Sequence, residues 1–121
     1  MNDKQALGDF GERLAAHHLE AAGLQIIERK VRTKAGEIDL IAREGTDLAF
    51  VEVRTRRGPP GQAAGSFTQA KLHRMWRCAL QWCITADVSA DRARLDAVIV
   101  ELNGSGVVRS VEHFRGLGPR E

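Results

Sequence analysis

The length, composition and charge of this chain exclude several classes of protein. Its 121 residues are enough for one domain with a modest core but not for two of ordinary size, so we expect a single domain over 1–121. With 43% hydrophobic and 28% charged residues, and no apolar run near the roughly 18 residues of a membrane span, the composition is that of a soluble globular protein. The charged, amphipathic N-terminus does not resemble a signal peptide, which favours a cytoplasmic protein without membrane contact. The net charge of +2 is too small to identify a partner.

The hydrophobic pattern predicts the secondary structure in chain order. Helical spacing of apolar residues predicts two helices, over 3–22 and 68–85. Alternating and short apolar runs predict five strands, over 24–32, 37–44, 47–54, 94–102 and 107–113. Prolines and glycines predict a flexible loop at about 55–66, and a tail is expected at about 114–121. The resulting αβββαββ order predicts an α/β domain with a mixed central sheet flanked by helices.

A turn at Gly45-Thr46 sets the expected register of the two central strands. Glycine at the first central position of a two-residue loop fits a type II′ turn. Such a turn pairs Glu44 with Asp47, and every pair further along the hairpin follows from that one.

In this register Asp39 lies opposite Glu52, and Glu37 lies opposite Arg54. Opposed like charges destabilise a sheet, so two facing carboxylates are tolerated when a cation lies between them. A divalent metal is one candidate for that cation. A structural ion-pair network produces the same pattern, and spacing alone does not separate the two interpretations.

A basic region follows the second hairpin strand. Acidic residues are absent between Val53 and Ala86, whereas basic side chains recur at Arg54, Arg56, Arg57, Lys71, His73, Arg74 and Arg77. A basic region beside a carboxylate pair suits a polyanion lying over a metal site. A solvated basic face is an equally common explanation for a run of this size.

Several short motifs together resemble the YraN family of bacterial proteins. They are Gly11-Glu12, Gly36-Glu37-Ile38-Asp39-Leu40, Phe50-Val51-Glu52-Val53-Arg54, Lys71 and Leu95-Asp96. The resemblance covers nearly the whole chain, from Gly8 to about Val100. It implies a restriction-endonuclease-like fold with an αβββαβ core, similar to archaeal Holliday-junction resolvases. The implied activity is metal-dependent endonuclease cleavage of phosphodiester bonds in branched or structured DNA.

The resemblance also implies roles for the matching residues. Asp39 and Glu52 correspond to the two acids of the nuclease signature and, with Glu12, would bind Mg²⁺ or Mn²⁺. Arg54 stands where lysine is usual, and an arginine cannot act as a base because it stays protonated. Lys71 is a candidate for the missing ammonium, so the expected catalytic set is Asp39, Glu52, Arg54 and Lys71.

The expected partner is nucleic acid, DNA rather than RNA, contacted by Arg56, Arg57, Lys71 and Arg74. A homodimer is implied by the resemblance, although no segment identifies its interface. Because of Arg54, an alternative is a catalytically weak or inactive DNA-binding or assembly protein that retains the nuclease fold. A third interpretation is an acidic scaffold for a protein partner.

Some other polar residues are expected to be structural. His17, His18, His73 and His113 match no metal motif and are expected at the surface. Asp96 begins an apolar strand and is expected outside the metal shell.

Overall fold

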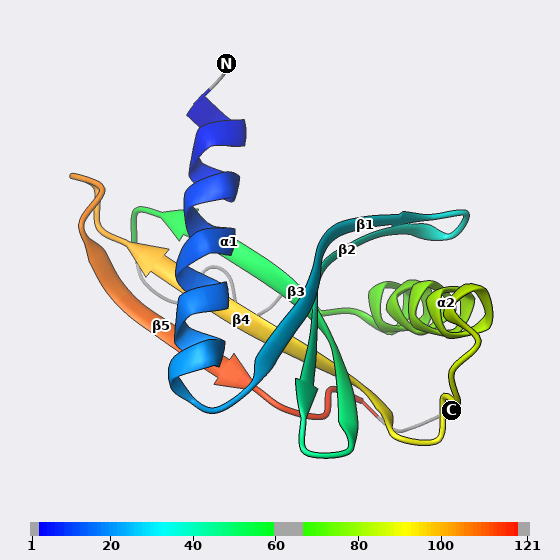
Figure 1. The fold of residues 1–121 in the computed structure, drawn as a ribbon. Helices are drawn as coiled ribbons and strands as arrows, with labels where there is room; N and C mark the ends of the chain where they lie inside the picture. Colours follow the sequence, from blue (N-terminus) through cyan, green and yellow to red (C-terminus); the bar gives the residue numbers. More distant parts are fainter. Residues whose placement is uncertain (1–2, 60–66, 119–121) are drawn as a thin grey trace.

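Two helices flank a five-stranded sheet in the computed structural model, which describes residues 3–59 and 67–118 (Figure 1). The helices are α1 (Asp3–Ala21) and α2 (Gln69–Ala86). The strands are β1 (Gln25–Thr33), β2 (Gly36–Glu44), β3 (Asp47–Arg57), β4 (Ala93–Leu102) and β5 (Val108–Phe114). The expected αβββαββ order is therefore confirmed.

The sheet is mixed, and its strands lie side by side in chain order. β3 pairs with β4 in parallel, while the other neighbours are antiparallel. The parallel pair follows from the position of α2 between β3 and β4, because a parallel connection must carry the chain back to the same end of the sheet. α1 covers one face of the sheet and α2 covers the other (Figure 1). The prediction of a mixed α/β sheet flanked by helices is confirmed.

Local signals fix the helix ends. At the end of α1, Gly23 has φ +99°, and the N–H of Leu24 donates to the carbonyl of Leu19 at 3.0 Å, which satisfies a terminal carbonyl. At the start of α2, the side chain of Thr68 accepts a hydrogen bond from the N–H of Lys71 and caps the helix. Neither helix, within the part of the chain that the structure describes, is long and apolar enough to cross a membrane.

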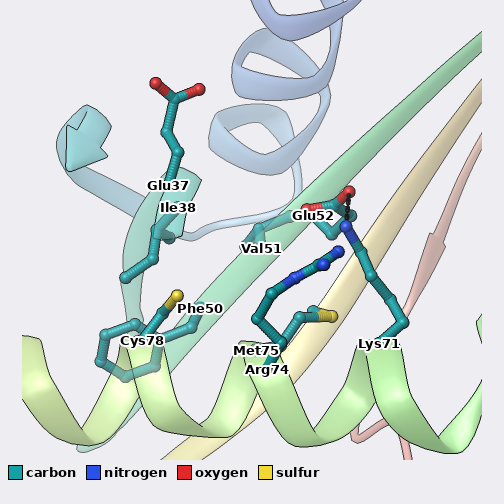
Figure 2. A pocket seen from close by; sticks show the side chains of 9 residues that line it. All are labelled: Glu37, Ile38, Phe50, Val51, Glu52, Lys71, Arg74, Met75 and Cys78. Carbon is teal, nitrogen blue, oxygen red and sulfur yellow. Dashed lines mark ion pairs between the residues drawn. The ribbon is translucent and has the colours of Figure 1, made fainter. Parts of the chain in front are cut away.

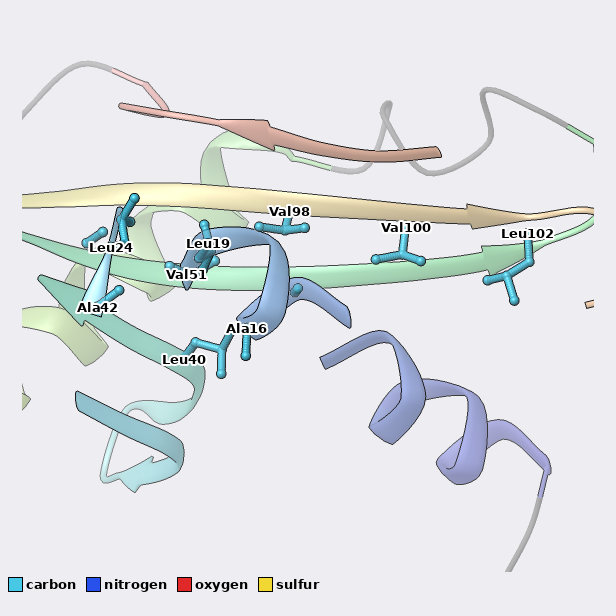
Figure 3. Close-up of a cluster of buried hydrophobic side chains, with 11 residues drawn as sticks. Ala16, Leu19, Leu24, Leu40, Ala42, Val51, Val98, Val100 and Leu102 are labelled. Carbon is cyan, nitrogen blue, oxygen red and sulfur yellow. The ribbon is translucent and has the colours of Figure 1, made fainter. Parts of the chain in front are cut away.

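Each helix covers its own hydrophobic cluster. Leu19 of α1 packs with Val51 and Val98 on one face of the sheet (Figure 3), and Trp76 of α2 packs with Phe50 on the other. Phe50 and Val51 are neighbours in the chain and are each 1% exposed, because successive side chains of a strand point to opposite faces. A fully buried side chain of this size contributes about 1.5–3 kcal/mol. β3 is thus buried on both faces and is a rigid base for residues at its ends.

The alternation of faces breaks down in β2. Leu40 and Ala42 belong to the cluster under α1, but Ile38 belongs to the cluster under α2. Regular alternation along a strand would place these three side chains on one face, so Ile38 departs from that pattern. The cause is that the β2–β3 pairing ends at Leu40–Val51, after which the β1–β2 hairpin leaves the sheet and extends over α2 (Figure 1). We call this projecting segment, residues 28–39, the arm.

The expected loop is shorter than predicted. β3 continues through Arg57, which pairs with Leu102 of β4, so residues 55–57 are strand and not loop. A strand neighbour that is distant in sequence supplied hydrogen bonds that local composition could not reveal. The rest of the predicted loop from 60 to 66 lies outside the described residues.

The expected tail begins later than predicted. Phe114 is the last residue of β5. Beyond it, the N–H of Gly116 donates to Asp96 Oδ1 at 3.1 Å, and the N–H of Leu117 donates to the carbonyl of Leu95 at 2.8 Å. The start of the predicted tail is therefore attached to β4, and residues 119–121 lie outside the described residues.

Candidate functional site

The hairpin register predicted from the Gly45-Thr46 turn is correct up to the point where the strands separate. Gly45 has φ +60°, and β2 and β3 pair from Glu44–Asp47 to Leu40–Val51. Asp39 and Glu52 are consequently the first residues beyond the ladder. They lie at the fork where β2 diverges from β3.

The carboxylate of Asp39 closes this fork. Its Oδ2 accepts a hydrogen bond from the N–H of Val53 at 2.8 Å. In a regular continuation of the ladder, the carbonyl of Ile38 would have been the acceptor for that N–H. The separation of the strands leaves the Val53 N–H without that backbone acceptor, and the Asp39 carboxylate takes its place. This hydrogen bond holds the Asp39 side chain at the fork.

Glu37 does not lie opposite Arg54, contrary to the prediction. Glu37 pairs with Arg32 of β1, and Arg32 Nη2 lies 3.7 Å from Glu37 Oε2. The predicted pairing required β2 and β3 to stay together, and the arm has already left β3 at this point. Arg54 has another partner, Glu52.

Asp39 lies in an environment that disfavours its charge. Burial, and then the charge of Glu52, raise the pKa of Asp39 to about 7, although the hydrogen bond from Val53 acts in the opposite direction. The charges of Glu12 and Glu37 raise this pKa further. A carboxylate that is only partly ionised at neutral pH beside a second carboxylate is a common feature of functional sites.

Two cations converge on Glu52. Lys71 Nζ lies 2.9 Å from Glu52 Oε2 (Figure 2). Arg54 Nε lies 3.5 Å from the same oxygen. All three side chains are less than 20% exposed, at 16% for Glu52, 17% for Arg54 and 18% for Lys71. The guanidinium of Arg54 also lies over the ring of Phe67, 5.1 Å from its centroid. The structure thus brings Lys71 to the site from the first turn of α2, as the sequence suggested.

Glu12 approaches the site from α1 and is held there by Lys30. Lys30 Nζ lies 2.9 Å from Glu12 Oε1 and 3.0 Å from Asp9 Oδ1. The hydrogen bonds that Lys30 donates to Glu12 and then to Asp9 raise the pKa of Lys30. Lys30 has φ +49°, in the left-handed region that non-glycine residues rarely adopt.

The sequence motifs did not indicate Lys30 as a site residue. It falls between the pairs Arg29–Leu40 and Val31–Ile38, at the position that a regular register would place opposite Asp39. The turn that pairs Thr33 with Gly36 fixes this register. The Thr33–Gly36 pair would therefore have predicted Lys30 as the neighbour of Asp39 on β1, just as the Gly45-Thr46 turn predicts Glu52 as its neighbour on β3.

The close approach of α1 to β3 depends on Gly11. Gly11 is buried against Thr55, and a β-carbon added to it would overlap with the Thr55 hydroxyl and lie 2.8 Å from Thr55 Cβ. Only glycine lets the helix lie this near to the strand. Glu12, the next residue, reaches the fork for that reason.

Replacing Gly11 with alanine is expected to push α1 away from β3. We expect Gly11→Ala to lower the free energy of unfolding by about 1–3 kcal/mol, as overpacking does. Adding Thr55→Ala, which removes the overlapping hydroxyl, is expected to restore part of the loss. Urea denaturation of the single and double variants measures both effects.

Gly8→Ala is the matched control on the same helix. A β-carbon at Gly8 meets no atom of the described residues within 4 Å. Alanine is a better helix former than glycine, so this variant is expected to be as stable as the wild type or more stable by up to about 1 kcal/mol. Equal losses in the two variants would contradict the role given to Gly11.

A small cavity lies beside the site, between α2 and the β2–β3 pair (Figure 2). Its volume is about 20 Å³, room for about one water molecule. Glu52, Lys71 and Arg74 line its polar side, and Phe50 and Met75 are part of its apolar side. Figure 2 shows Lys71 and Arg74 rising from α2 toward Glu52.

The residues predicted to contact nucleic acid do not all lie together. Lys71 and Arg74 line the cavity beside Glu52. Arg56 donates from Nη1 to the carbonyl of Thr55 at 3.0 Å. Arg57 donates to the carbonyl of Gly104 and lines a hollow with residues of α1, on the other face of the sheet. The structure therefore places Lys71 and Arg74 at the site and directs Arg57 elsewhere.

The three predicted metal ligands are near one another but engaged with protein groups. Within residues 3–59 and 67–118, no three acidic, histidine or cysteine side chains form a ready-made metal-binding group. Asp39 accepts from Val53, Glu52 is paired with two cations, and Glu12 is paired with Lys30. Mg²⁺ is usually held by one or two carboxylates together with waters and phosphate oxygens. Asp39 and Glu52 fit such a site, and Glu12 would join it on release from Lys30.

A second polar cluster is structural. The prediction that His113 lies at the surface is wrong, because its side chain is 4% exposed and its Nε2 lies 2.8 Å from Asp96 Oδ2. Asp96 is fully buried and also accepts from Arg94 and from the N–H of Gly116. This carboxylate joins β4 to the segment after β5 and takes no part at the fork.

Comparison with known proteins agrees with the resemblance read from the motifs. The family described as "Uncharacterised protein family UPF0102" matches residues 11–100, which include the whole candidate site. A UPF0102 protein of Beutenbergia cavernae is 45% identical over 98% of this chain and 100% of the relative. UPF0102 proteins of Frankia alni and Frankia casuarinae are 43% and 41% identical over 96% of this chain and 97% and 98% of their own lengths. The chain belongs to UPF0102, the YraN family.

Proposed function

We propose that this protein binds nucleic acid and hydrolyses phosphodiester bonds in DNA with a divalent metal ion, Mg²⁺ or Mn²⁺. One observation supports this most: Asp39 and Glu52 lie at the fork of β2 and β3, with Lys71 Nζ 2.9 Å from Glu52. Two carboxylates and an ammonium at one point are the groups that metal-assisted phosphodiester hydrolysis uses. The resemblance to Holliday-junction resolvases suggests branched or structured DNA as the substrate.

Each side chain at the fork has a part in this proposal. Asp39 and Glu52 would hold the ion, which when bound lowers the pKa of a water and neutralises charge on the phosphate. Lys71 would orient the attacking water or a phosphate oxygen. A guanidinium does not serve as a base, so Arg54 would stabilise negative charge on the phosphate.

Cleavage of labelled four-way junction, flap, duplex and single-stranded DNA tests the proposal. We expect the wild type to give products only with Mg²⁺ or Mn²⁺. Glu52→Gln is expected to reduce the rate by at least about 100-fold, because it removes a metal ligand whose contribution is several kcal/mol. Glu112→Gln, which changes an exposed acid on β5, is the matched control and is expected to cleave at the wild-type rate.

A second candidate is a protein that binds nucleic acid without cutting it. The observation in its favour is that Lys71 and Arg54 already neutralise Glu52 in this structure, and that Arg54 replaces the usual lysine. Binding with no metal-dependent product from any of the four substrates would support this candidate and reject the nuclease. The homodimer implied by the resemblance stays a prediction, which light scattering after size-exclusion chromatography would check.

A further inference from the structure

We propose that Lys30 is a positioning residue that controls whether Glu12 is available to a divalent cation at the fork. In the metal-free protein the ammonium of Lys30 holds the Glu12 carboxylate, and Asp9 keeps the ammonium when Glu12 turns to the cation. This inference rests on the proposed function, because the cation is the Mg²⁺ or Mn²⁺ that Asp39 and Glu52 would bind. It gives roles to Lys30 and Asp9, which the sequence motifs did not indicate.

The ammonium of Lys30 joins the arm to α1. Lys30 Nζ lies 2.9 Å from Glu12 Oε1 and 3.0 Å from Asp9 Oδ1. Asp9 and Glu12 are three residues apart in α1, so their side chains lie on the same side of the helix and one ammonium reaches both. Lys30 therefore loses only one of these two ion pairs when Glu12 leaves it.

The backbone of Lys30 has an unusual conformation for a lysine. Its φ of +49° lies in the left-handed region, which favours glycine. Such conformations persist where the surrounding structure compensates for their cost, and they concentrate at functional sites. The backbone of Lys30 is thus an indication, separate from the ion pairs, that this side chain has a function.

The three acids near the fork are neutralised unequally. Glu52 is paired with two cations and Glu12 is paired with Lys30, whereas the Asp39 carboxylate accepts from the backbone N–H of Val53. Burial, and then the charges of Glu52 and Glu12, raise the pKa of Asp39 to about 7. Glu12 is therefore near enough to Asp39 for their charges to interact. A cation that binds Asp39 also attracts Glu12.

Lys30 is the cation near the fork that moves away most easily. Its side chain is 53% exposed, whereas the side chains of Arg54 and Lys71 are 17% and 18% exposed. A divalent cation adds two positive charges, which repel the basic groups already present. The exposed ammonium of Lys30 turns toward water at little cost because it ends a flexible four-carbon chain. The geometry therefore points to Lys30, and not to the two more buried cations, as the group that gives up its carboxylate.

Binding of Mn²⁺ to the protein without DNA tests this role, with the free ion measured by electron paramagnetic resonance. Lys30→Met keeps a side chain of comparable length without the charge. It is expected to bind Mn²⁺ at least about tenfold more tightly than the wild type, because Glu12 no longer has to leave an ammonium. A purely structural role of Lys30 would not raise the affinity. Thermal melting in EDTA establishes that the variant is folded, and Lys30→Gln replaces it if it is not.

The same substitution in a Glu12→Gln background separates an effect through Glu12 from a general effect of charge. Arg29→Met is the matched control, because it removes an exposed positive charge from the neighbouring position of β1. It is expected to change the Mn²⁺ affinity of the wild type by no more than about threefold. If Lys30 acts by holding Glu12, Lys30→Met should have an effect no larger than this when residue 12 is glutamine.

Asp9→Asn removes the second partner of the ammonium. Lys30 then depends on Glu12, so this variant is expected to bind Mn²⁺ at least about fivefold more weakly than the wild type. In the Lys30→Met background the same change should alter the affinity by no more than about twofold. An equal loss in both backgrounds would mean that Asp9 acts through its charge alone, and it would overturn the role given to Asp9.

The outcomes distinguish this inference from the proposed function. If the wild type binds Mn²⁺ and Glu52→Gln binds it less well, the metal site stands. An unchanged or lower affinity of Lys30→Met, or a gain that persists in full with Glu12→Gln, then overturns the role of Lys30 alone. If the wild type binds no Mn²⁺, the proposed function fails, and the role of Lys30 fails with it.

Discussion

Asp39→Asn is expected to stabilise the metal-free protein at pH 8 by up to about 4 kcal/mol. The pKa of Asp39 is about 7 in the folded chain against an ordinary value of 3.8, because burial and then the charge of Glu52 disfavour its ionised form. Each pH unit of such a difference corresponds to about 1.4 kcal/mol. Asparagine keeps an oxygen that can accept the hydrogen bond from Val53 and removes the charge. Urea denaturation in EDTA measures the gain.

The stability difference between Asp39→Asn and the wild type is expected to depend on pH. A raised carboxyl pKa means that the folded state binds the proton more tightly than the unfolded state, so ionisation of Asp39 costs stability. This cost is absent below pH 3.8, grows as the pH rises toward 7, and is constant above that. The difference between Asp39→Asn and the wild type should therefore be near zero at pH 4 and largest at pH 8.

A bound metal ion should make the wild type more stable than Asp39→Asn. A divalent cation between Asp39 and Glu52 relieves their repulsion, so Mn²⁺ or Mg²⁺ is expected to raise the melting temperature of the wild type and not that of Asp39→Asn. Glu20→Gln, at an exposed position of α1, is the control and should stay within about 0.5 kcal/mol of the wild type at every pH. An equal metal response in wild type and Asp39→Asn would reject the metal site.

Much of this fold follows from local sequence signals. The apolar spacing in both helices predicted their ends to within one residue, because a capping threonine and a glycine stop mark them in the chain. The Gly45-Thr46 turn gave the correct β2–β3 register, and that register alone brings Asp39 and Glu52 to the same level of the sheet. Turns are informative because a single pair fixes all later pairs of a hairpin.

The fork itself could not be predicted from periodicity. A pattern of alternating residues assumes a regular strand, and β2 changes faces between Leu40 and Ile38. At this point the Asp39 carboxylate accepts the N–H of Val53, and Lys30 on the neighbouring strand has a left-handed backbone. Neither feature leaves a trace in the spacing of apolar residues along a strand.

Contacts between distant elements account for the other differences. Arg57 looked like a phosphate ligand in a run of arginines, but it binds the carbonyl of Gly104 in the turn between β4 and β5. His113 matched no motif and is nevertheless buried against Asp96. Charge runs identify basic residues, and only the fold decides which of them face a ligand.

Arg94→Met is expected to be the most destabilising substitution of a charged residue outside the fork, at about 3–5 kcal/mol. Arg94 Nε lies 3.1 Å from Asp96 Oδ1, Nη1 lies 2.9 Å from Asp47 Oδ2, and Nη2 lies 2.6 Å from Glu44 Oε1. Methionine has a comparable length but no charge. It would leave the fully buried Asp96 with His113 and one backbone N–H as its partners.

The stability that Arg94→Met loses should grow as the pH rises. Burial acts to raise the pKa of Asp96, but hydrogen bonds from His113 and Arg94 hold it below its ordinary value. In the wild type the network is therefore stable above the ordinary carboxyl pKa and weakens only in strong acid. Without Arg94, burial prevails and raises the pKa of Asp96, so the variant loses stability as the carboxyl group ionises.

Two comparisons isolate the buried pair from a general loss of charge. Arg92→Met removes a neighbouring arginine that is 64% exposed and pairs with Asp47, so a loss below about 1 kcal/mol is expected. Adding Asp96→Asn to Arg94→Met should restore part of the stability at neutral pH, because it removes the uncompensated charge. Urea denaturation of the four proteins at acid and neutral pH measures the coupling. If Arg92→Met and Arg94→Met were equally destabilised, or if the second substitution restored nothing, Asp96 would not be the group that makes Arg94 necessary.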